Sequence, residues 1–358
     1  MTKKKRILFI APYPFNEAPS QRFRFEQYFD FLKQNDFILD FKPFLNLKTW
    51  HRLYQKGNTI QKIIGISSSF TKRLIQMLTL YKYDYVFIHR EASHLGPPIF
   101  EWIITKIWRK KYIYDFDDAI WIPNFSQSNA KFQKLKNYKK VNLCMKWAHQ
   151  ISAGNAFLAE YASQFNSNTV IIPTTIDMNY HIVSKDQKNL QKPVIGWTGT
   201  HTTLRYLDVL IPILKELETK YNFDFLIISN ETPTYNLNSL KFIKWNKKNE
   251  IQDLNRISIG VMPLVKDKWS EGKCGFKGLQ YMSIGIPSLM SPVGVNTEII
   301  EHGKNGFLLN TPEEWKQCLI QLLENPGLRE TIGLAGKKTI KDKYSVEANK
   351  KNYLNLFQ

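Results

Sequence analysis

The chain has 358 residues, of which 43% are hydrophobic, 14% aromatic and 23% charged. This composition is globular and excludes a disordered or collagen-like protein, and the length predicts two domains rather than one. Charge is distributed unevenly: residues 1–150 hold 26 basic and 11 acidic residues, a net charge of +15, whereas residues 151–358 add only +4. We therefore expect the first part of the chain to meet an anionic partner, either nucleic acid or an anionic membrane surface.

The basic start of the chain, residues 2–6, is followed by a short apolar run and then a proline. That run is too short for a signal peptide, and no run approaches the roughly 18 apolar residues of a membrane span. The three cysteines, Cys144, Cys274 and Cys318, are odd in number and lack metal-site spacing. We expect a reducing, cytoplasmic location, in which any membrane contact is peripheral.

Short apolar runs alternate with amphipathic segments along the chain, which predicts parallel strands covered by helices. A strand at residues 7–11 is followed by a helix whose N-cap we assign to Ser20. Further strands of the first half are expected at residues 37–41, 85–88, 112–114, 151–153 and 170–172. Strands of the second half are expected at residues 194–197, 225–228, 242–243, 257–264 and 287–290.

This alternation predicts two doubly wound α/β domains. The polar stretch at residues 174–193 is interpreted as a linker between an N-terminal domain, residues 1–173, and a C-terminal domain, residues 194–335. Residues 336–358 are expected to be helical and to pack back toward the N-terminal domain. Because ligands bind outside the carboxyl ends of the strands in such sheets, we expect an interdomain cleft.

The segment most indicative of chemistry is residues 271–287, a loop of small residues that enters a helix. Gly275 permits close backbone approach, and the start of the helix offers unpaired N–H groups. Lys273 and Lys277 add positive charge. This combination suits a phosphate group, although a glycine-containing turn whose lysines face water remains an equal alternative.

This segment and its continuation resemble the donor-binding signature of the retaining family 4 glycosyltransferases, which are group 1 glycosyl transferases. The residues that match in order and spacing are Met282, Gly285, Pro287, Val293, Gly294, Glu298 and residues 303–308. The resemblance implies the GT-B fold, with two facing Rossmann-like domains, parallel sheets and an interdomain cleft. It also implies transfer of a sugar from a nucleoside diphosphate sugar, with retention at the anomeric carbon and with no metal and no further cofactor.

Two glutamates of that signature are out of register here. The second falls on Gln280, whose side-chain amide can still bond ribose hydroxyls. The first falls on Gly272, next to Glu271, to which the resemblance then assigns the sugar contacts.

Members of this family also bind the diphosphate with an arginine and a lysine that follow the first strand of the second domain. Thr200 falls on the arginine position, and Arg205 lies one residue before the lysine position. We expect Arg205 to supply charge with the two lysines, although an exposed helix cation is the alternative. The expected donor-site residues are Gly199, Thr200, Arg205, Lys273, Gly275, Phe276, Lys277, Gln280 and Glu298.

Three carboxylates, Asp115, Asp117 and Asp118, crowd the end of a predicted strand in the first domain. Such crowding costs electrostatic free energy unless cations, hydroxyl donors or solvent lie nearby. It therefore favours a functional site over a purely structural role for these residues. In the resembling fold, Asp117 falls where many family members carry a histidine beside the anomeric carbon. We expect Asp117, Asp118 and Glu271 to be catalytic, and an Asp-x-Asp metal motif is the alternative.

Three basic stretches, residues 71–78, 106–111 and 131–140, place cations beside apolar residues. They suit peripheral attachment to anionic lipid at the inner face of the plasma membrane, and solvated helix faces are the alternative. We find no nucleic-acid reader module and expect no nucleic-acid partner.

Charge and resemblance together imply a lipid-linked saccharide acceptor in the assembly of bacterial cell-surface polysaccharide, such as lipopolysaccharide or capsule. Two alternatives stay open. One is a GT-B-fold nucleotide-sugar epimerase, and the other is a catalytically weak, membrane-associated partner of a glycan assembly complex.

Overall fold

The computed structural model describes residues 4–53, 57–123, 136–183 and 192–358. The chain divides into two compact units: the first is Met1–Thr174 with Asn349–Gln358, and the second is Thr175–Ala348. Part of the expected linker, residues 184–191, and part of the third basic stretch, residues 131–135, lie outside the described residues.

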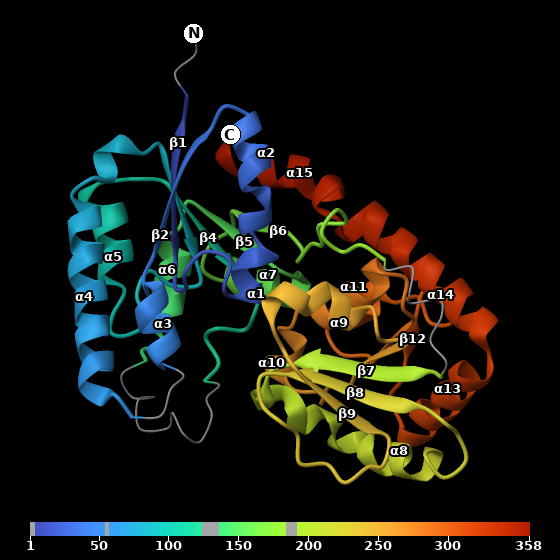
Figure 1. Ribbon diagram of the computed structural model, residues 1–358. Coiled ribbons are helices and arrows are strands. Elements are labelled where there is room, and N and C mark those ends of the chain that lie inside the picture. The colour runs from blue at the N-terminus through green and yellow to red at the C-terminus, as the bar shows by residue number, and fades with distance from the viewer. Residues whose placement is uncertain (1–3, 54–56, 124–135, 184–191) are drawn as a thin grey trace. The chain divides into compact units, whose positions relative to one another are not determined.

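The first unit is built on a parallel six-stranded sheet with the order β2-β1-β3-β4-β5-β6 (Figure 1). Its strands are β1 (Arg6–Ala11), β2 (Ile38–Pro43), β3 (Tyr85–His89), β4 (Tyr112–Phe116), β5 (Gln150–Ala153) and β6 (Thr169–Ile171). The order of the strands reverses between β1 and β3, which creates a topological switch point. The carboxyl ends of β1, β3 and β4 therefore lie where doubly wound sheets bind ligands.

Helices cover both faces of this sheet (Figure 1). They are α1 (Pro19–Arg22), η1 (Glu26–Tyr28), α2 (Phe29–Gln34), α3 (Leu47–Leu53), α4 (Thr59–Met77), η2 (Leu80–Lys82), α5 (Ile99–Trp102), the π-helical turn η3 (Ile103–Ile107), α6 (Lys140–Trp147) and α7 (Ala156–Ser163). The assignment of Ser20 as an N-cap is wrong, because Ser20 lies inside α1, whose N-cap residue is Ala18. Pro19 starts that helix instead, since its fixed φ suits the first helical position.

Aromatic residues from both ends of the chain fill the core of the first unit. The ring of Phe9 in β1 contacts the rings of Phe25, Phe87 and Phe357 at centroid distances of 5.6, 5.0 and 6.2 Å. Tyr353 stacks on Tyr28 with centroids 4.1 Å apart. The last ten residues, from the end of α15 (Val346–Leu354) through η9 (Asn355–Phe357), are thus part of this core.

The second unit holds another parallel six-stranded sheet, with the order β12-β11-β10-β7-β8-β9. Its strands are β7 (Val194–Gly199), β8 (Asp224–Ser229), β9 (Leu240–Lys244), β10 (Ile259–Met262), β11 (Ser288–Met290) and β12 (Phe307–Leu308). The strand order reverses between β7 and β10, so the segments after these two strands border the switch point. The predicted α/β class, with a parallel sheet in each half of the chain, is confirmed.

The helices of the second unit include those that carry the expected donor site. They are η6 (His201–Val209), α8 (Ile211–Leu217), η7 (Lys247–Asn249), α9 (Glu250–Leu254), α10 (Lys268–Glu271), α11 (Phe276–Ser283), α12 (Asn296–Ile299), α13 (Pro312–Glu324), α14 (Pro326–Thr339) and the π-helical turn η8 (Ile340–Tyr344). Within the described residues, we find no helix with the length and apolar character needed to cross a membrane.

Candidate functional site

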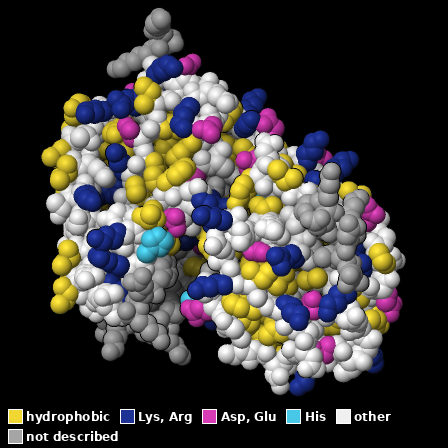
Figure 2. Space-filling model, in the orientation of Figure 1, with side chains coloured by type: hydrophobic (Ala, Val, Ile, Leu, Met, Phe, Trp, Pro, Cys, Tyr) yellow, Lys and Arg dark blue, Asp and Glu magenta, His cyan; other side chains and the backbone are white. Residues whose placement is uncertain are grey.

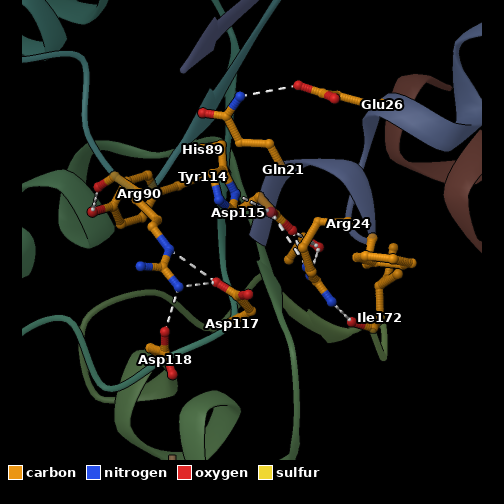
Figure 3. A network of polar contacts seen from close by, with 12 residues as sticks. Gln21, Arg24, Glu26, His89, Arg90, Tyr114, Asp115, Asp117, Asp118 and Ile172 are labelled. Atoms are coloured by element: carbon orange, nitrogen blue, oxygen red, sulfur yellow. Dashed lines mark hydrogen bonds and ion pairs between the residues drawn. The ribbon is translucent and has the colours of Figure 1, made fainter. Parts of the chain in front are cut away.

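The acidic run of the first unit separates into two clusters with different partners (Figure 3). Asp115 lies in β4 and pairs in register with His89 of β3, whereas Asp117 and Asp118 lie in the segment after the strand. Arg90 directly follows β3. The two neighbouring strand ends thus bring charged groups of both signs to one edge of the sheet.

Asp115 belongs to a buried network, and its side chain is 1% exposed. Arg24 Nε donates to Asp115 Oδ2 over 3.4 Å, and the Arg24 side chain also donates to the carbonyl of Ile172. Ser152 donates to Oδ1 over 2.7 Å, and His89 Nδ1 lies 2.7 Å from Oδ2. Burial alone would raise the pKa of Asp115, but the Arg24 guanidinium and the His89 hydrogen bond hold it below its usual range.

This network corrects the expectation that all three carboxylates form one site. Asp115 is shielded from solvent and its oxygens are bonded within the unit, so it ties β4 to β3, β5 and the segment between α1 and η1. The end of β4 at Phe116 explains the separation, since residue 115 still lies in the sheet while the next two carboxylates lie beyond its edge.

Arg90 binds both remaining carboxylates. Its Nε and Nη2 donate to Asp117 Oδ1 over 2.9 and 2.6 Å, and Nη2 also donates to Asp118 Oδ2. The side chains of Arg90, Asp117 and Asp118 are 19, 13 and 23% exposed, so the cluster is reachable from solvent. Arg90 has a φ of 59°, a left-handed backbone conformation that costs energy for a residue with a Cβ.

A second group of charges surrounds the segment just after Arg90. Lys140 Nζ lies 2.9 Å from Glu91 Oε2 and donates to the carbonyl of Ser93 over 2.6 Å. His94 packs against the rings of Phe44 and Tyr13. Burial lowers the pKa of His94 to about 4, although Glu91 opposes this shift. For Glu91, burial would raise the pKa, but Lys140 and His94 lower it to about 2.

A cavity of about 860 Å³ opens in the first unit close in sequence to Asp118. Its walls include the aromatic side chains of Trp121, Tyr138 and Tyr161, together with Lys136 and Asn142. Trp121 stacks on Tyr161 with centroids 3.8 Å apart, and Tyr161 donates to Asn142 Oδ1 over 3.0 Å. Flat aromatic faces beside amide and ammonium groups are the surfaces that a saccharide with a charged substituent requires.

In the second unit, the expected donor-site residues come from two segments that flank the switch point. Gly199 ends β7, and Thr200 is the N-cap residue of η6. Gly275 is the N-cap residue of α11, with a φ of 67° that favours glycine. A Cβ at Gly199 would lie 3.0 Å from Lys277 Cε, so the two segments are in contact.

Aromatic rings hold the three cations expected at this place. Arg205 and Lys273 both lie over the ring of Tyr206, at 5.3 and 5.9 Å from its centroid. Lys273 also lies 5.5 Å from the centroid of Trp269, and Lys277 lies 5.6 Å from that of Trp197. Arg205 and Lys273 therefore share one ring, and Lys277 lies over a different ring of the same unit.

The remaining signature residues pack against the same loop. A Cβ at Gly294 would lie 2.6 Å from the carbonyl oxygen of Glu271, and one at Gly275 would lie 2.3 Å from Ile299 Cδ1. Glu271, at the end of α10, is half-buried, and Glu298 on α12 is exposed. Gln280 on α11 is only 2% exposed, so its side chain is shielded from a ligand at the surface of the unit.

The sequence analysis missed the groups that hold these charges. Arg90 was assigned no role from the sequence, and its neighbour His89 is fully buried against Asp115. Tyr206 was not singled out, although it lies between the two expected cations in the printed sequence. A search for aromatic residues beside each basic residue of the loops would have found it.

Comparison with known proteins assigns the second unit to a family. Residues 192–325 match the family described as glycosyl transferases group 1. An uncharacterized glycosyltransferase of Methanocaldococcus jannaschii is 37% identical over 82 residues, which cover 22% of this chain and 21% of that protein. A second one from the same organism is 27% identical over 161 residues, covering 42 and 44%. The matched stretches thus span less than half of either relative.

Solved structures resemble the chain over nearly its whole length. Sucrose-phosphate synthase of Thermosynechococcus elongatus has a TM-score of 0.71 at 13% identity, covering 99% of this chain and 98% of that one. HepE of Anabaena, in complex with UDP and glucose, has a TM-score of 0.66 at 15% identity and 99% coverage of both chains. At these identities the likeness is one of fold. The chain therefore has the GT-B fold of these neighbours, and its residues 192–325 match the family of group 1 glycosyl transferases.

Proposed function

We propose that the protein is a glycosyltransferase that moves a sugar from a nucleoside diphosphate sugar to an acceptor hydroxyl. The observation that carries this proposal is the position of Lys277 beside Gly199 at the start of α11, with Lys273 and Arg205 over the shared ring of Tyr206, within the matched domain. The crystal structures of HepE with UDP and with UDP-glucose support a nucleoside diphosphate donor.

The second unit binds the diphosphate in this proposal. Departure of the nucleoside diphosphate leaves negative charge on its oxygens, and cations with N–H donors stabilise that charge. Lys273 and Lys277 supply the charge, and the N–H groups of Phe276 and Lys277 supply donors at the start of α11. Glu298 and Thr200 are proposed to contact the nucleotide, whereas buried Gln280 is left without a proposed contact. Neither a metal nor a further cofactor is needed in this scheme.

Asp117 and Asp118 of the first unit are the proposed groups beside the anomeric carbon, with Glu271 on the sugar hydroxyls. A carboxylate there stabilises an oxocarbenium-like transition state, and retention of configuration is proposed from the resemblance to the retaining family. Arg90 fixes both carboxylates through hydrogen bonds to each of them. It therefore acts as a positioning residue that keeps the acidic pair oriented.

We propose that the acceptor is a lipid-linked saccharide used to assemble a bacterial cell-surface polysaccharide, at the cytoplasmic face of the plasma membrane. The net charge of +15 in residues 1–150 supports a peripheral contact with anionic lipid. The cavity lined by Trp121 and Tyr161 is the proposed place for an acceptor sugar, since its aromatic faces suit a pyranose ring.

A two-step experiment tests this function. First, thermal unfolding is followed in the presence of a panel of nucleoside diphosphates, and at least one should raise the midpoint. Second, the matching nucleotide sugars are incubated with lipid-linked acceptors, and the products are separated by chromatography. Transfer of the sugar supports the proposal, whereas epimerised donor without transfer would indicate an epimerase. Absence of both stabilisation and turnover would favour a non-catalytic partner of an assembly complex.

A further inference from the structure

Helix α4 exposes large apolar side chains instead of burying them. Residues at helical spacing along one face are at least half exposed, with exposed fractions of 51–74%: Ile60, Ile63, Ile64, Leu74, Ile75 and Leu78. Figure 2 shows hydrophobic side chains at the surface over this outer helix, with Lys and Arg side chains nearby. A surface helix of a globular protein ordinarily turns such a stripe toward the core.

The opposite face of α4 explains this orientation, because it packs inward through a buried arginine and a close helix contact as well as through Ser69 and Met77. A Cβ at Gly65 would lie 2.7 Å from Thr49 Cγ2, so α3 approaches closely there. Arg73 is 1% exposed and donates to the carbonyls of Ala92 and Lys42 over 3.1 and 2.9 Å. These bonds fix the rotation of the helix, and rotating the isoleucines inward would leave the buried guanidinium without its acceptors.

The neighbouring element extends the apolar surface. Phe70 of α4 lies 6.0 Å from Phe100 of α5, and Tyr81 lies 6.4 Å from Trp108, as measured between ring centroids. The two segments therefore lie side by side. The second segment adds Trp102 and Ile107, which are 45 and 59% exposed.

Charge on these two segments is almost entirely positive. Residues 57–82 contain no aspartate or glutamate, and Glu101, the acidic residue of residues 99–111, is buried at 1% exposure. Exposed cations on the two segments include Lys72, Lys82, Lys106 and Arg109. An apolar face bordered by cations matches the interface of a bilayer with acidic headgroups, where side chains enter the acyl boundary and lysines meet phosphates.

We propose that the exposed face of α4, extended by Trp102 and Ile107, is the surface through which the protein docks on an anionic membrane. This proposal rests on the membrane part of the proposed function and is independent of sugar transfer. A second copy of the chain fits the face less well. Ser67 and Thr71 interrupt the stripe, so it lacks the continuous apolar seam of a paired helix, and two copies would bring like charges together.

The test is flotation of the full-length protein with vesicles of phosphatidylcholine, with and without phosphatidylglycerol. We expect binding to the phosphatidylglycerol vesicles and its loss in about 0.5 M salt. The double variant Ile64→Ser/Ile75→Ser should reduce the partition coefficient roughly tenfold or more, since both side chains are exposed and their loss leaves the core intact. A matched control, Val265→Ser/Leu334→Ser, alters two similarly exposed residues of the second unit and should bind as the wild type does.

A charge variant, Lys72→Gln/Lys106→Gln, should weaken binding to anionic vesicles while leaving the weak binding to neutral vesicles unchanged. Equal wild-type binding to both vesicle types, or unaltered binding of the isoleucine variant, would overturn the proposal. The proposal would also be overturned if the wild-type protein bound no vesicles and formed a dimer that the isoleucine double variant dissociates. That result would identify a second copy of the chain as the occupant of this face. Thermal stabilisation by nucleoside diphosphates, measured on the same variants, tests the proposed function separately and should not change.

Discussion

The charged side chains at the end of β4 in the first unit and near the start of α11 in the second contact different kinds of partner. In the first unit, each carboxylate of the acidic run is bonded to an arginine, Asp115 to Arg24 and the following two to Arg90. In the second unit, Arg205, Lys273 and Lys277 lie over the rings of Tyr206, Trp269 and Trp197.

The difference matters because a carboxylate cancels the charge of its partner, whereas an aromatic ring orients a cation without neutralising it. The first arrangement fixes the orientation of the acidic side chains at the edge of the sheet. The second orients cations through rings that carry no opposing charge, which suits the anionic diphosphate of the donor that we propose. In our proposal, the two regions divide the tasks of sugar transfer.

The largest effect is expected from breaking the buried pair in the first unit. Arg24→Ala leaves Asp115 charged and without its guanidinium, which should lower the free energy of unfolding by about 3–5 kcal/mol. Urea unfolding of the full chain measures this change. Lys33→Ala is the control, because its ion pair with Asp30 is exposed and should contribute little. An Arg24→Ala protein as stable as the control variant would contradict the structural role of this network.

Within the same acidic run, the variant Asp117→Asn tests the effect of this side chain on kcat separately from its effect on stability. The amide keeps the shape of the side chain but removes its negative charge, so kcat should fall about 100-fold or more while the urea midpoint changes little. The donor KM should stay close to that of the wild type, since the diphosphate is bound by the second unit in our proposal. Asp30→Asn on α2 provides an exposed control. Full activity of Asp117→Asn would remove this residue from the reaction.

The His94 cluster predicts an acid-sensitive stability of the first unit. Burial lowers the pKa of His94 from 6.5 to about 4, so below pH 6.5 the unfolded chain binds a proton that the folded chain does not. The free energy of unfolding should therefore fall by about 3 kcal/mol as the pH drops through this window. Urea unfolding at several pH values measures the slope. His94→Phe preserves a ring beside Phe44 and should flatten the curve, and an unchanged slope would assign the acid sensitivity elsewhere.

The smallest expected effect concerns a single cation of the second unit. Lys277→Met keeps the aliphatic stem that packs beside Gly199 but removes the ammonium, so affinity for a nucleoside diphosphate should fall about tenfold. Calorimetric titration measures the affinity. Lys268→Met, which alters an exposed lysine at the start of α10, is the matched control and should bind like the wild type. Equal affinities of the two variants would exclude Lys277 from the donor site.

Local signals were enough for every strand except β12, which was not predicted, and for the loop before α11. Buried apolar runs such as residues 7–11 predicted central strands, and the small residues around Gly275 predicted a loop that enters a helix. The family resemblance, which rested on residues such as Gly285 and Pro287, is confirmed by the match over residues 192–325.

Features that depend on contacts between residues far apart in the chain could not be predicted from the sequence. Periodicity reveals a stripe on α4 but does not say that it faces outward, because that orientation is set by Arg73 and by carbonyls of β1, β2 and the segment after β3. The separation of Asp115 from Asp117 likewise depends on Arg24 and Arg90, which come from other elements. The prediction of Ser20 as a helix N-cap was wrong for a local reason: Pro19 takes the first position of α1, so Ser20 lies inside the helix.

The stacking of Tyr353 on Tyr28, and of Phe357 near Phe9, has a consequence for biosynthesis. A ribosome makes the first unit's sheet early, but the residues that close its aromatic core emerge last, after the whole second unit. During synthesis the rings around β1 must stay uncovered until the final helix arrives. A chain that stops before residue 349 would therefore leave that aromatic surface exposed, and such a nascent product should aggregate or require a chaperone.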